Sequence, residues 1–275
     1  MTGQNINKIP FIDDPLLLNE GILKKQEQKF QQLLDQLLSS AKEYCADIRL
    51  IGSMAFRIKC PDFRSLEYKN LRYLTDLDFI CLSSDIYKLQ DMFLDLGWVE
   101  NQNVLRLHGD KRRIFYHPTE ELHSDIFIDK LRFCHVIDFK RRLTIDYPTI
   151  SLADLLLEKM QIVEINKKDL VDTFVLLKQY DFSDEEKEDF INLGYIKSLL
   201  SNNWGFYKTF TENLYKGKKL IPQYLDGQDQ QEVLDKLDRL NEELQNSAKS
   251  FKWKLRSWIG DKIKWYREVE DLQRD

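Results

Sequence analysis

The pattern of hydrophobic and polar positions changes character near Pro148. Before this residue, short apolar runs, several of them alternating with polar residues, predict strands over 47–52, 76–82, 104–107, 113–116, 122–128 and 142–145. Helical spacing there predicts helices over 23–44 and 85–96, the second ended by Gly97. After Pro148, apolar residues recur at helical spacing over 152–163, 169–179, 184–190, 196–200, 204–215, 230–245 and 250–272. We therefore expect an α/β (α+β) chain, with a mixed-sheet domain over 1–147 and a helical domain over 148–275.

Composition narrows the class of protein. Of the 275 residues, 43% are hydrophobic, which is ample for a core. The net charge of −5 argues against tight, indiscriminate binding of nucleic acid. No run of about 18 apolar residues predicts a membrane span. None of the four cysteines forms a C-x-x-C pair, and Cys45 and Cys81 lie among apolar residues, which predicts buried thiols. We expect a cytoplasmic protein with no membrane partner.

Two aspartates stand inside one predicted strand, at Asp76 and Asp78. Residues i and i+2 of a strand point to the same face, so the two carboxylates project together. Burying adjacent carboxylates without a cation is costly. The simplest cation is Mg²⁺, or Mn²⁺ in its place, because both prefer hard oxygen ligands. The alternative is a capping or solvated pair, as in most Asp-x-Asp sequences.

A Gly-Ser turn, Gly52-Ser53, ends the first predicted strand. Glycine tolerates positive φ and lets a ligand approach the backbone closely. Ser53 is expected to cap a following helix, and helix N-termini attract phosphate groups. The alternative is an ordinary strand-turn-helix junction with a capping serine.

A third carboxylate is expected on the strand 122–128. Asp125 lies in the middle of this strand, where an unpaired carboxylate is costly. Asp129 lies at its end beside Lys130, where a surface ion pair explains it equally well. Asp125 is the preferred third ligand, and Asp129 is the alternative.

Gly-Ser, then Asp-x-Asp, then a later strand aspartate resembles the motif set of the nucleotidyltransferase superfamily with the DNA-polymerase-β-like fold. The resemblance covers about residues 45–180, and the segments 125–135 and 148–172 resemble bacterial nucleotidyltransferases related to abortive-infection toxins. It implies metal ligation and catalysis by Asp76, Asp78 and Asp125. It also implies phosphate binding at Gly52 and Ser53. One departure is the longer connection before Asp76, which includes 60–68 and adds basic residues such as Arg57.

Lys159 lies in an otherwise apolar helix. A lysine there commonly extends its ammonium group to solvent. The resemblance instead implies a nucleotide-binding role for Lys159, and it implies that Asp169 or Asp172 belongs to the active site. The alternative for both aspartates is a favourable interaction with a helix N-terminus.

The C-terminal segment interleaves basic and aromatic residues. Such a surface binds RNA through phosphate contacts and base stacking. However, a set of apolar and aromatic residues recurs at helical spacing: Phe251, Leu255, Trp258, Ile259, Ile263 and Tyr266. An amphipathic helix with a buried apolar stripe and a solvated basic face is therefore the preferred interpretation.

The resemblance therefore implies a metal-dependent enzyme that moves a nucleoside monophosphate from an NTP to an acceptor and releases pyrophosphate. The acceptor is RNA, tRNA, a protein or a small molecule. One alternative is a catalytically silent nucleotide-binding protein of the same fold. Another is a toxin-like tRNA-modifying enzyme with a partner protein from a two-gene system.

Overall fold

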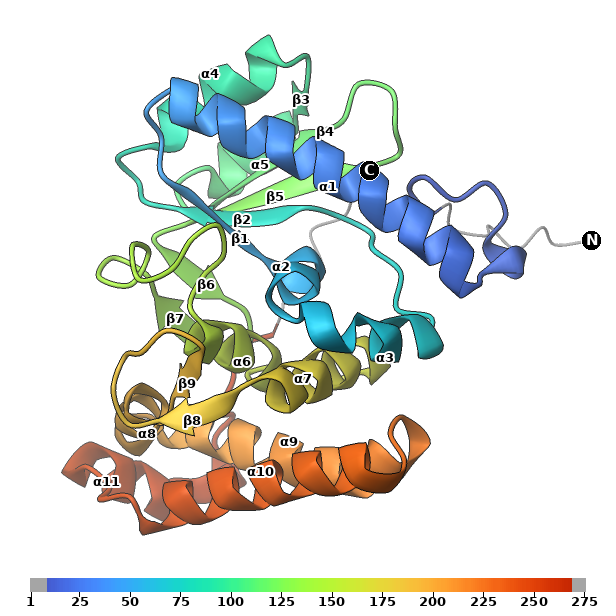
Figure 1. Ribbon diagram of the computed structural model, residues 1–275. Helices are drawn as coiled ribbons and strands as arrows, with labels where there is room; N and C mark the ends of the chain where they lie inside the picture. Colours follow the sequence, from blue (N-terminus) through green and yellow to red (C-terminus); the bar gives the residue numbers. More distant parts are fainter. Residues whose placement is uncertain (1–8, 269–275) are drawn as a thin grey trace, which may run out of the picture. The chain divides into compact units, whose positions relative to one another are not determined.

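The computed structural model describes residues 9–268 (Figure 1). The chain divides into two compact units. Among the described residues, the first unit contains 9–55, 68–130 and 139–149. The second unit contains 56–67, 131–138 and 150–268. The predicted domain boundary lies between 147 and 148, next to the last change of unit. The segments 56–67 and 131–138 precede that boundary and belong to the second unit.

A five-stranded mixed sheet forms the centre of the first unit, as the alternation predicts for this half of the chain. Its order is β1-β2-β5-β4-β3. The pair β2–β5 is parallel, whereas β1–β2, β4–β5 and β3–β4 are antiparallel. The strands are β1 (Ile48–Ile51), β2 (Asp78–Cys81), β3 (Val99–Glu100), β4 (Arg112–Tyr116) and β5 (His123–Ile128).

Three helices accompany this sheet: α1 (Glu20–Glu43), α4 (Ile86–Asp95) and α5 (Gln102–His108). Gly97 follows α4 with a φ of +82°, as its predicted role in ending the helix requires. The predicted strand at 104–107 is wrong, because this run lies in α5. The Asn101 side chain accepts hydrogen bonds from two backbone N–H groups and starts that helix. The predicted strand at 142–145 is also wrong, since a series of turns occupies these residues.

The long connection before Asp76 is folded. It contains α2 (Gly52–Lys59), a 3-10 helix (Pro61–Phe63) and α3 (Arg64–Lys69). Arg57 is 1% exposed, and its Nε atom lies 3.3 Å from Oε2 of Glu67. Glu67 is also buried, so Arg57 contributes to the core of the second unit.

Helices dominate the second unit, as predicted. They are α6 (Leu152–Met160), α7 (Lys167–Gln179), α8 (Leu193–Asn202), α9 (Trp204–Leu220), α10 (Gly227–Asn246) and α11 (Phe251–Ile259). Helices α7 and α9 both contact α10 and run alongside it (Figure 1). Two small sheets join them, β6 (Lys130–Arg132) with β7 (Val136–Asp138) and β8 (Asp181–Ser183) with β9 (Phe190–Asn192). The predicted helix at 184–190 is wrong, because residues 184–189 connect β8 to β9.

The predicted C-terminal helix over 250–272 is shorter than expected. Ser250 caps α11 through its side chain, and Gly260 ends it with a φ of +58°. A short 3-10 helix (Gly260–Lys262) follows. Residues 269–272 of the prediction lie outside the described residues. No helix between residues 9 and 268 is both long and apolar enough to cross a membrane.

The cysteine predictions have mixed outcomes. Cys81 is fully buried on β2, and burial raises the pKa of its thiol. Cys45 is exposed, so the prediction of a buried thiol there is wrong. It follows the end of α1 in a left-handed conformation, with φ of +50°, which turns the chain toward β1.

Candidate functional site

Two of the predicted carboxylates lie on neighbouring strands. Phe79 of β2 is paired with Ile126 of β5 in the parallel register, so Asp78 and Asp125 occupy the position one residue earlier. Aligned residues of parallel strands point to the same face, with Cα atoms about 4.8 Å apart. Asp125 is 3% exposed and Asp78 is half-buried. The sheet therefore places two carboxylates side by side, one of them removed from solvent.

Gly52 lies against Asp78, one of these two carboxylates. Ile51 of β1 pairs with Asp78, and Gly52 follows with a φ of +72°. A Cβ atom at Gly52 would lie 3.1 Å from Oδ2 of Asp78. This position therefore needs glycine both for its conformation and for its closeness to the carboxylate. Gly52 is also the first residue of α2, so Ser53 lies in the first helical turn and not at the capping position expected from the sequence.

An arginine from β4 contacts the third predicted ligand. Nη2 of Arg112 lies 2.5 Å from Oδ2 of Asp125, and the guanidinium group lies over the ring of Phe127, 5.2 Å from its centroid. Oδ1 of Asp125 and Nε of Arg112 are buried and have no hydrogen-bond partner among the described residues. Arg112 thus offsets the charge of Asp125 through Oδ2, and the buried Oδ1 is left without a hydrogen bond among the described residues.

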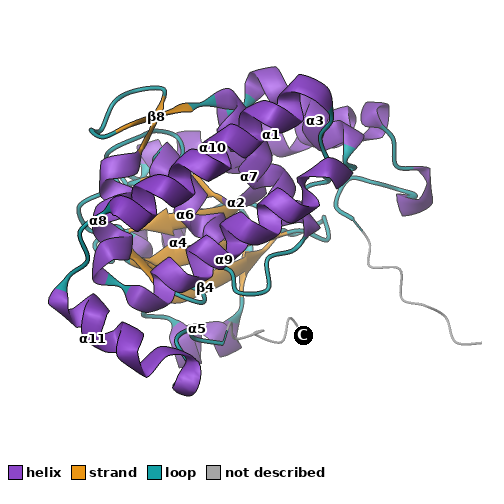
Figure 2. Ribbon diagram, turned by 90° about the horizontal axis from the view of Figure 1, so that it is seen from below, coloured by secondary structure: helices purple, strands orange, loops and turns teal. Residues whose placement is uncertain are grey.

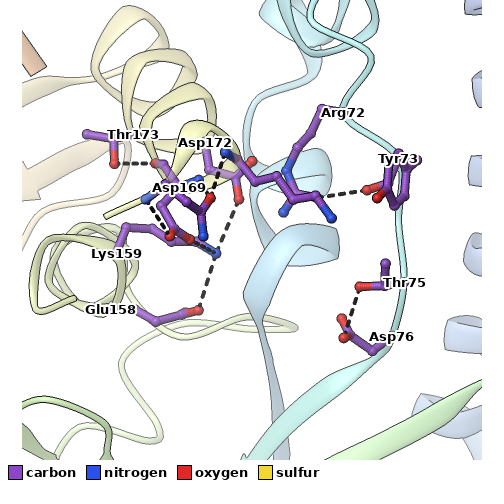
Figure 3. A network of polar contacts seen from close by, with 11 residues as sticks. Arg72, Tyr73, Thr75, Asp76, Glu158, Lys159, Asp169, Asp172 and Thr173 are labelled. Atoms are coloured by element: carbon purple, nitrogen blue, oxygen red, sulfur yellow. Dashed lines mark hydrogen bonds and ion pairs between the residues drawn. The ribbon is translucent and has the colours of Figure 1, made fainter. Parts of the chain in front are cut away.

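Asp76 lies just before β2, not inside it as predicted. Its Oδ2 atom accepts a hydrogen bond from the hydroxyl of Thr75, at 2.9 Å (Figure 3). Within residues 9–268, no three acidic, histidine or cysteine side chains are grouped closely enough to hold a metal ion. In this conformation the site consequently presents the pair Asp78 and Asp125, with Asp76 turned to its neighbour.

Asp129, the alternative third ligand, has a structural role. Its φ of +60° ends the alternation of β5. Oδ1 accepts a hydrogen bond from the backbone N–H of Ser83, and Oδ2 lies 3.5 Å from Nζ of Lys140. Lys140, and not the adjacent Lys130, is its cationic neighbour. These bonds tie the end of β5 to the residues that follow β2.

Lys159 belongs to the second unit, in α6. Its Nζ atom lies 3.2 Å from Asp172, 3.6 Å from Asp169 and 3.8 Å from Glu158 (Figure 3). It also lies 5.2 Å from the ring centroid of Phe56. Only 10% of the Lys159 side chain is exposed, so it does not extend to solvent. Lys159 therefore contacts both Asp169 and Asp172, the two aspartates that the resemblance offered.

Asp169 also has the capping role that its alternative interpretation suggests. The side chain of Asn166 accepts a hydrogen bond from the Asp169 backbone, and the carboxylate of Asp169 accepts one from the Asn166 backbone. This reciprocal pair starts α7. Asp169 thus caps the N-terminus of α7 and also contacts the ammonium group of Lys159.

Sequence reasoning missed Arg112. The Lys111-Arg112-Arg113 run opens a strand, and alternation alone shows that Arg112 and Arg113 face opposite sides of the sheet. Only the pairing of Ile114 with Asp125 shows which of the two arginines shares a face with the carboxylate. That pairing joins separate strands and is not encoded in the local pattern.

Comparisons with known proteins identify no relative of this chain: no family model, curated protein or solved structure matches it.

Proposed function

We propose that this chain is a metal-dependent nucleotidyltransferase that moves a nucleoside monophosphate from an NTP to an acceptor and releases pyrophosphate. The observation that carries the proposal is the alignment of Asp78 with Asp125 on parallel strands, with the Gly52 backbone against Asp78. A buried carboxylate whose second oxygen lacks a partner is costly unless a ligand completes it.

The chemistry of these donors fits a small divalent cation. Mg²⁺ is commonly held by one or two carboxylates, with waters and substrate phosphates completing its ligands. Asp78 and Asp125 would hold it, and Asp76 would join them by releasing the Thr75 hydroxyl. When bound, the metal would offset phosphate charge and favour loss of the proton from the acceptor hydroxyl.

The glycine turn supplies the expected phosphate contact. Gly52 and Ser53 open α2, and the N-terminus of a helix carries a partial positive charge. Helix N-termini bind phosphate groups, and a side chain at Gly52 would obstruct the approach of a phosphate. The proposal assigns no step to Lys159, because its ammonium group is engaged by three carboxylates of its own unit.

One observation favours the silent nucleotide-binding alternative. Arg112 occupies Oδ2 of Asp125 and brings a positive charge to the carboxylate pair. If this contact persisted with nucleotide bound, it would reduce the charge available for a metal. That alternative predicts NTP binding without pyrophosphate release.

Transfer of label separates the two functions. Purified protein is incubated with each α-³²P-labelled NTP, Mg²⁺ and, in turn, total RNA, protein and small-molecule extracts. The proposal predicts labelled product that disappears in Asp78→Asn and persists in Asp129→Asn. Asp129 is the matched control because asparagine keeps the oxygen that accepts from Ser83. Equal labelling by Asp78→Asn would overturn the proposal, and nucleotide binding without labelled product from any extract would favour the silent alternative.

The proposal leaves open which acceptor receives the nucleotide and whether the protein acts as a toxin. RNA, tRNA, protein and small-molecule acceptors are separated by the extract that takes up the label. The toxin-like alternative predicts growth arrest on expression that Asp78→Ala relieves, together with a partner protein from a two-gene system. A cytoplasmic location is a further expectation.

A further inference from the structure

Helix α11 exposes an apolar stripe to solvent. Its residues are Phe251 (76% exposed), Leu255 (42%), Trp258 (81%) and Ile259 (40%), continued by Ile263 (60%). The expectation of a buried stripe is therefore wrong, since α11 has no buried residue. Its opposite face contacts α8 and α9 of the same unit (Figure 2).

The inner face of α11 is held by aromatic contacts. The ring of Trp253 lies edge-on to Tyr207, with 5.2 Å between centroids. Arg256 lies over the ring of Trp204 at 4.5 Å and donates to the carbonyls of Gly260 and Ile263. The helix is thus fixed by one side, and only its outer half is accessible to a partner.

Positive charge borders the apolar stripe. Lys252, Lys254 and Lys262 are exposed and form no ion pair with any residue from 9 to 268. Residues 249–268 contain seven basic and two acidic side chains, a net charge of +5 in a chain whose total is −5. The rest of the chain is therefore acidic, and an anionic partner surface would attract this segment and repel the remainder.

Contrary to the expectation of no membrane partner, we propose that the outer face of α11 (Phe251, Leu255, Trp258 and Ile259) binds an anionic membrane surface. Ile263, which follows the helix, and the three exposed lysines belong to the same binding surface. Tryptophan, phenylalanine and aliphatic residues beside lysines are typical of helices that lie in the lipid interface. A flat lipid interface can contact this face without surrounding the helix. A protein groove that surrounds a helix would instead overlap α8 and α9, which already pack against α11. Leu255, Ile259 and Ile263 have no suitable contact on RNA, and two copies meeting through α11 would bring like charges together.

Vesicle binding tests this proposal on the full chain. Co-sedimentation is measured with phosphatidylcholine vesicles and with vesicles containing phosphatidylglycerol, at low salt and at high salt. We expect binding to the anionic vesicles that weakens in high salt and without phosphatidylglycerol. Phe251→Ser/Trp258→Ser is expected to weaken partitioning at least about tenfold, because two large exposed apolar side chains are lost.

Matched variants control for altered charge and solubility. Lys252→Glu/Lys254→Glu/Lys262→Glu should abolish the preference for anionic vesicles. The same charge change on α1, in Lys25→Glu/Lys29→Glu/Lys42→Glu, should leave that preference in place, and Leu107→Ser/Tyr215→Ser should leave partitioning unchanged. No binding of the unmodified chain to anionic vesicles would overturn the proposal. Two other results would also overturn it, if no vesicle binding is seen. One is a dimer in analytical ultracentrifugation that the α11 variants abolish, and the other is RNA binding in a filter assay that the same variants abolish.

Discussion

Two adjacent arginines of β4 form ion pairs on opposite faces of one sheet, and their partners are completed to different degrees. Arg113 contacts Oε1 of Glu100 at 2.5 Å and also donates to the carbonyl of Gly109. The second oxygen of Glu100 accepts from the side chain of Gln90 at 2.6 Å. The side chains of Arg113 and Glu100 are 4% and 2% exposed, so this pair is buried with both carboxylate oxygens bonded.

Arg112, on the other face, contacts only one oxygen of Asp125. The other oxygen and Nε of Arg112 are buried without partners among the described residues. Buried polar atoms are nearly always hydrogen-bonded, and an exception calls for an explanation such as a bound ion or water. The Glu100 pair is therefore complete within the fold, whereas Asp125 keeps one oxygen that is unbonded within residues 9–268, which the proposed metal would complete.

Breaking the completed pair should have the largest effect on stability. Glu100→Ala leaves Arg113 buried without its carboxylate, so we expect the free energy of unfolding to fall by about 3–5 kcal/mol. Transfer per folded molecule should not change. Urea denaturation measures the loss, with the exposed Glu43→Ala as control. A loss no larger than that of the control would contradict the structural role of this pair.

Removing the charge of Asp125 should have the opposite effects to Glu100→Ala: a large loss of transfer activity and a smaller loss of stability. Asp125→Asn is expected to reduce nucleotidyl transfer at least about 100-fold, because a proposed metal ligand is lost. Its free energy of unfolding should fall less than that of Glu100→Ala. The Arg112 side chain is 17% exposed, so water can hydrate it once its partner is neutral. Full activity with a large loss of stability would show that Asp125 is structural.

The second unit also contains a buried titratable group, His135, which is uncharged near neutral pH. The His135 ring stacks on Phe206, with 4.7 Å between centroids, and Nε2 lies 2.8 Å from the hydroxyl of Thr209. Burial lowers the pKa of His135 to about 4. An unfolded histidine has a pKa of about 6.5, so between these values the unfolded chain binds the proton that the folded chain excludes.

Stability should therefore fall as the pH decreases through this interval. Between pH 7 and pH 5, His135 is expected to lower the free energy of unfolding by about 2 kcal/mol. His135→Gln removes the titrating group, so its stability should change less over the same interval. Urea denaturation of both proteins at each pH gives the difference. Identical pH dependence in the two proteins would contradict a buried neutral His135.

The smallest expected effect separates backbone strain from contact with the site. Gly52→Ala and Gly227→Ala both place alanine at positive φ, so each should lose about 1 kcal/mol of stability. A Cβ at Gly227 meets nothing within 4 Å, whereas one at Gly52 meets the Asp78 carboxylate. Only Gly52→Ala should reduce transfer. Equal activity in both variants would argue against a role for this contact.

Local patterns predicted much of the fold. Alternation identified β4 and β5 and placed Asp125 on a buried strand, and helical spacing identified most of the second unit. The failure at 104–107 has a simple cause: a short apolar run fits either element, and the Asn101 cap decides for a helix. Gly260 similarly ends α11 where periodicity alone continues the helix.

The site was predictable only in part. The Gly-Ser turn and Asp78 are visible in the sequence, but the parallel pairing that aligns Asp78 with Asp125 joins distant segments. Arg112 required the same information. For α11, periodicity gave the correct apolar stripe but not whether anything covers it. Trp258 is accordingly 81% exposed where a core position was expected.

Metal binding tests the central claim most directly. Mn²⁺ is titrated into the protein and followed by electron paramagnetic resonance, with and without a non-hydrolysable NTP analogue. The account predicts that the protein binds Mn²⁺ and that the analogue strengthens this binding. Binding should be lost in Asp78→Asn and Asp125→Asn and retained in Asp129→Asn. Mn²⁺ binding of equal strength in all four proteins, or no binding with the analogue present, would contradict a metal site at Asp78 and Asp125.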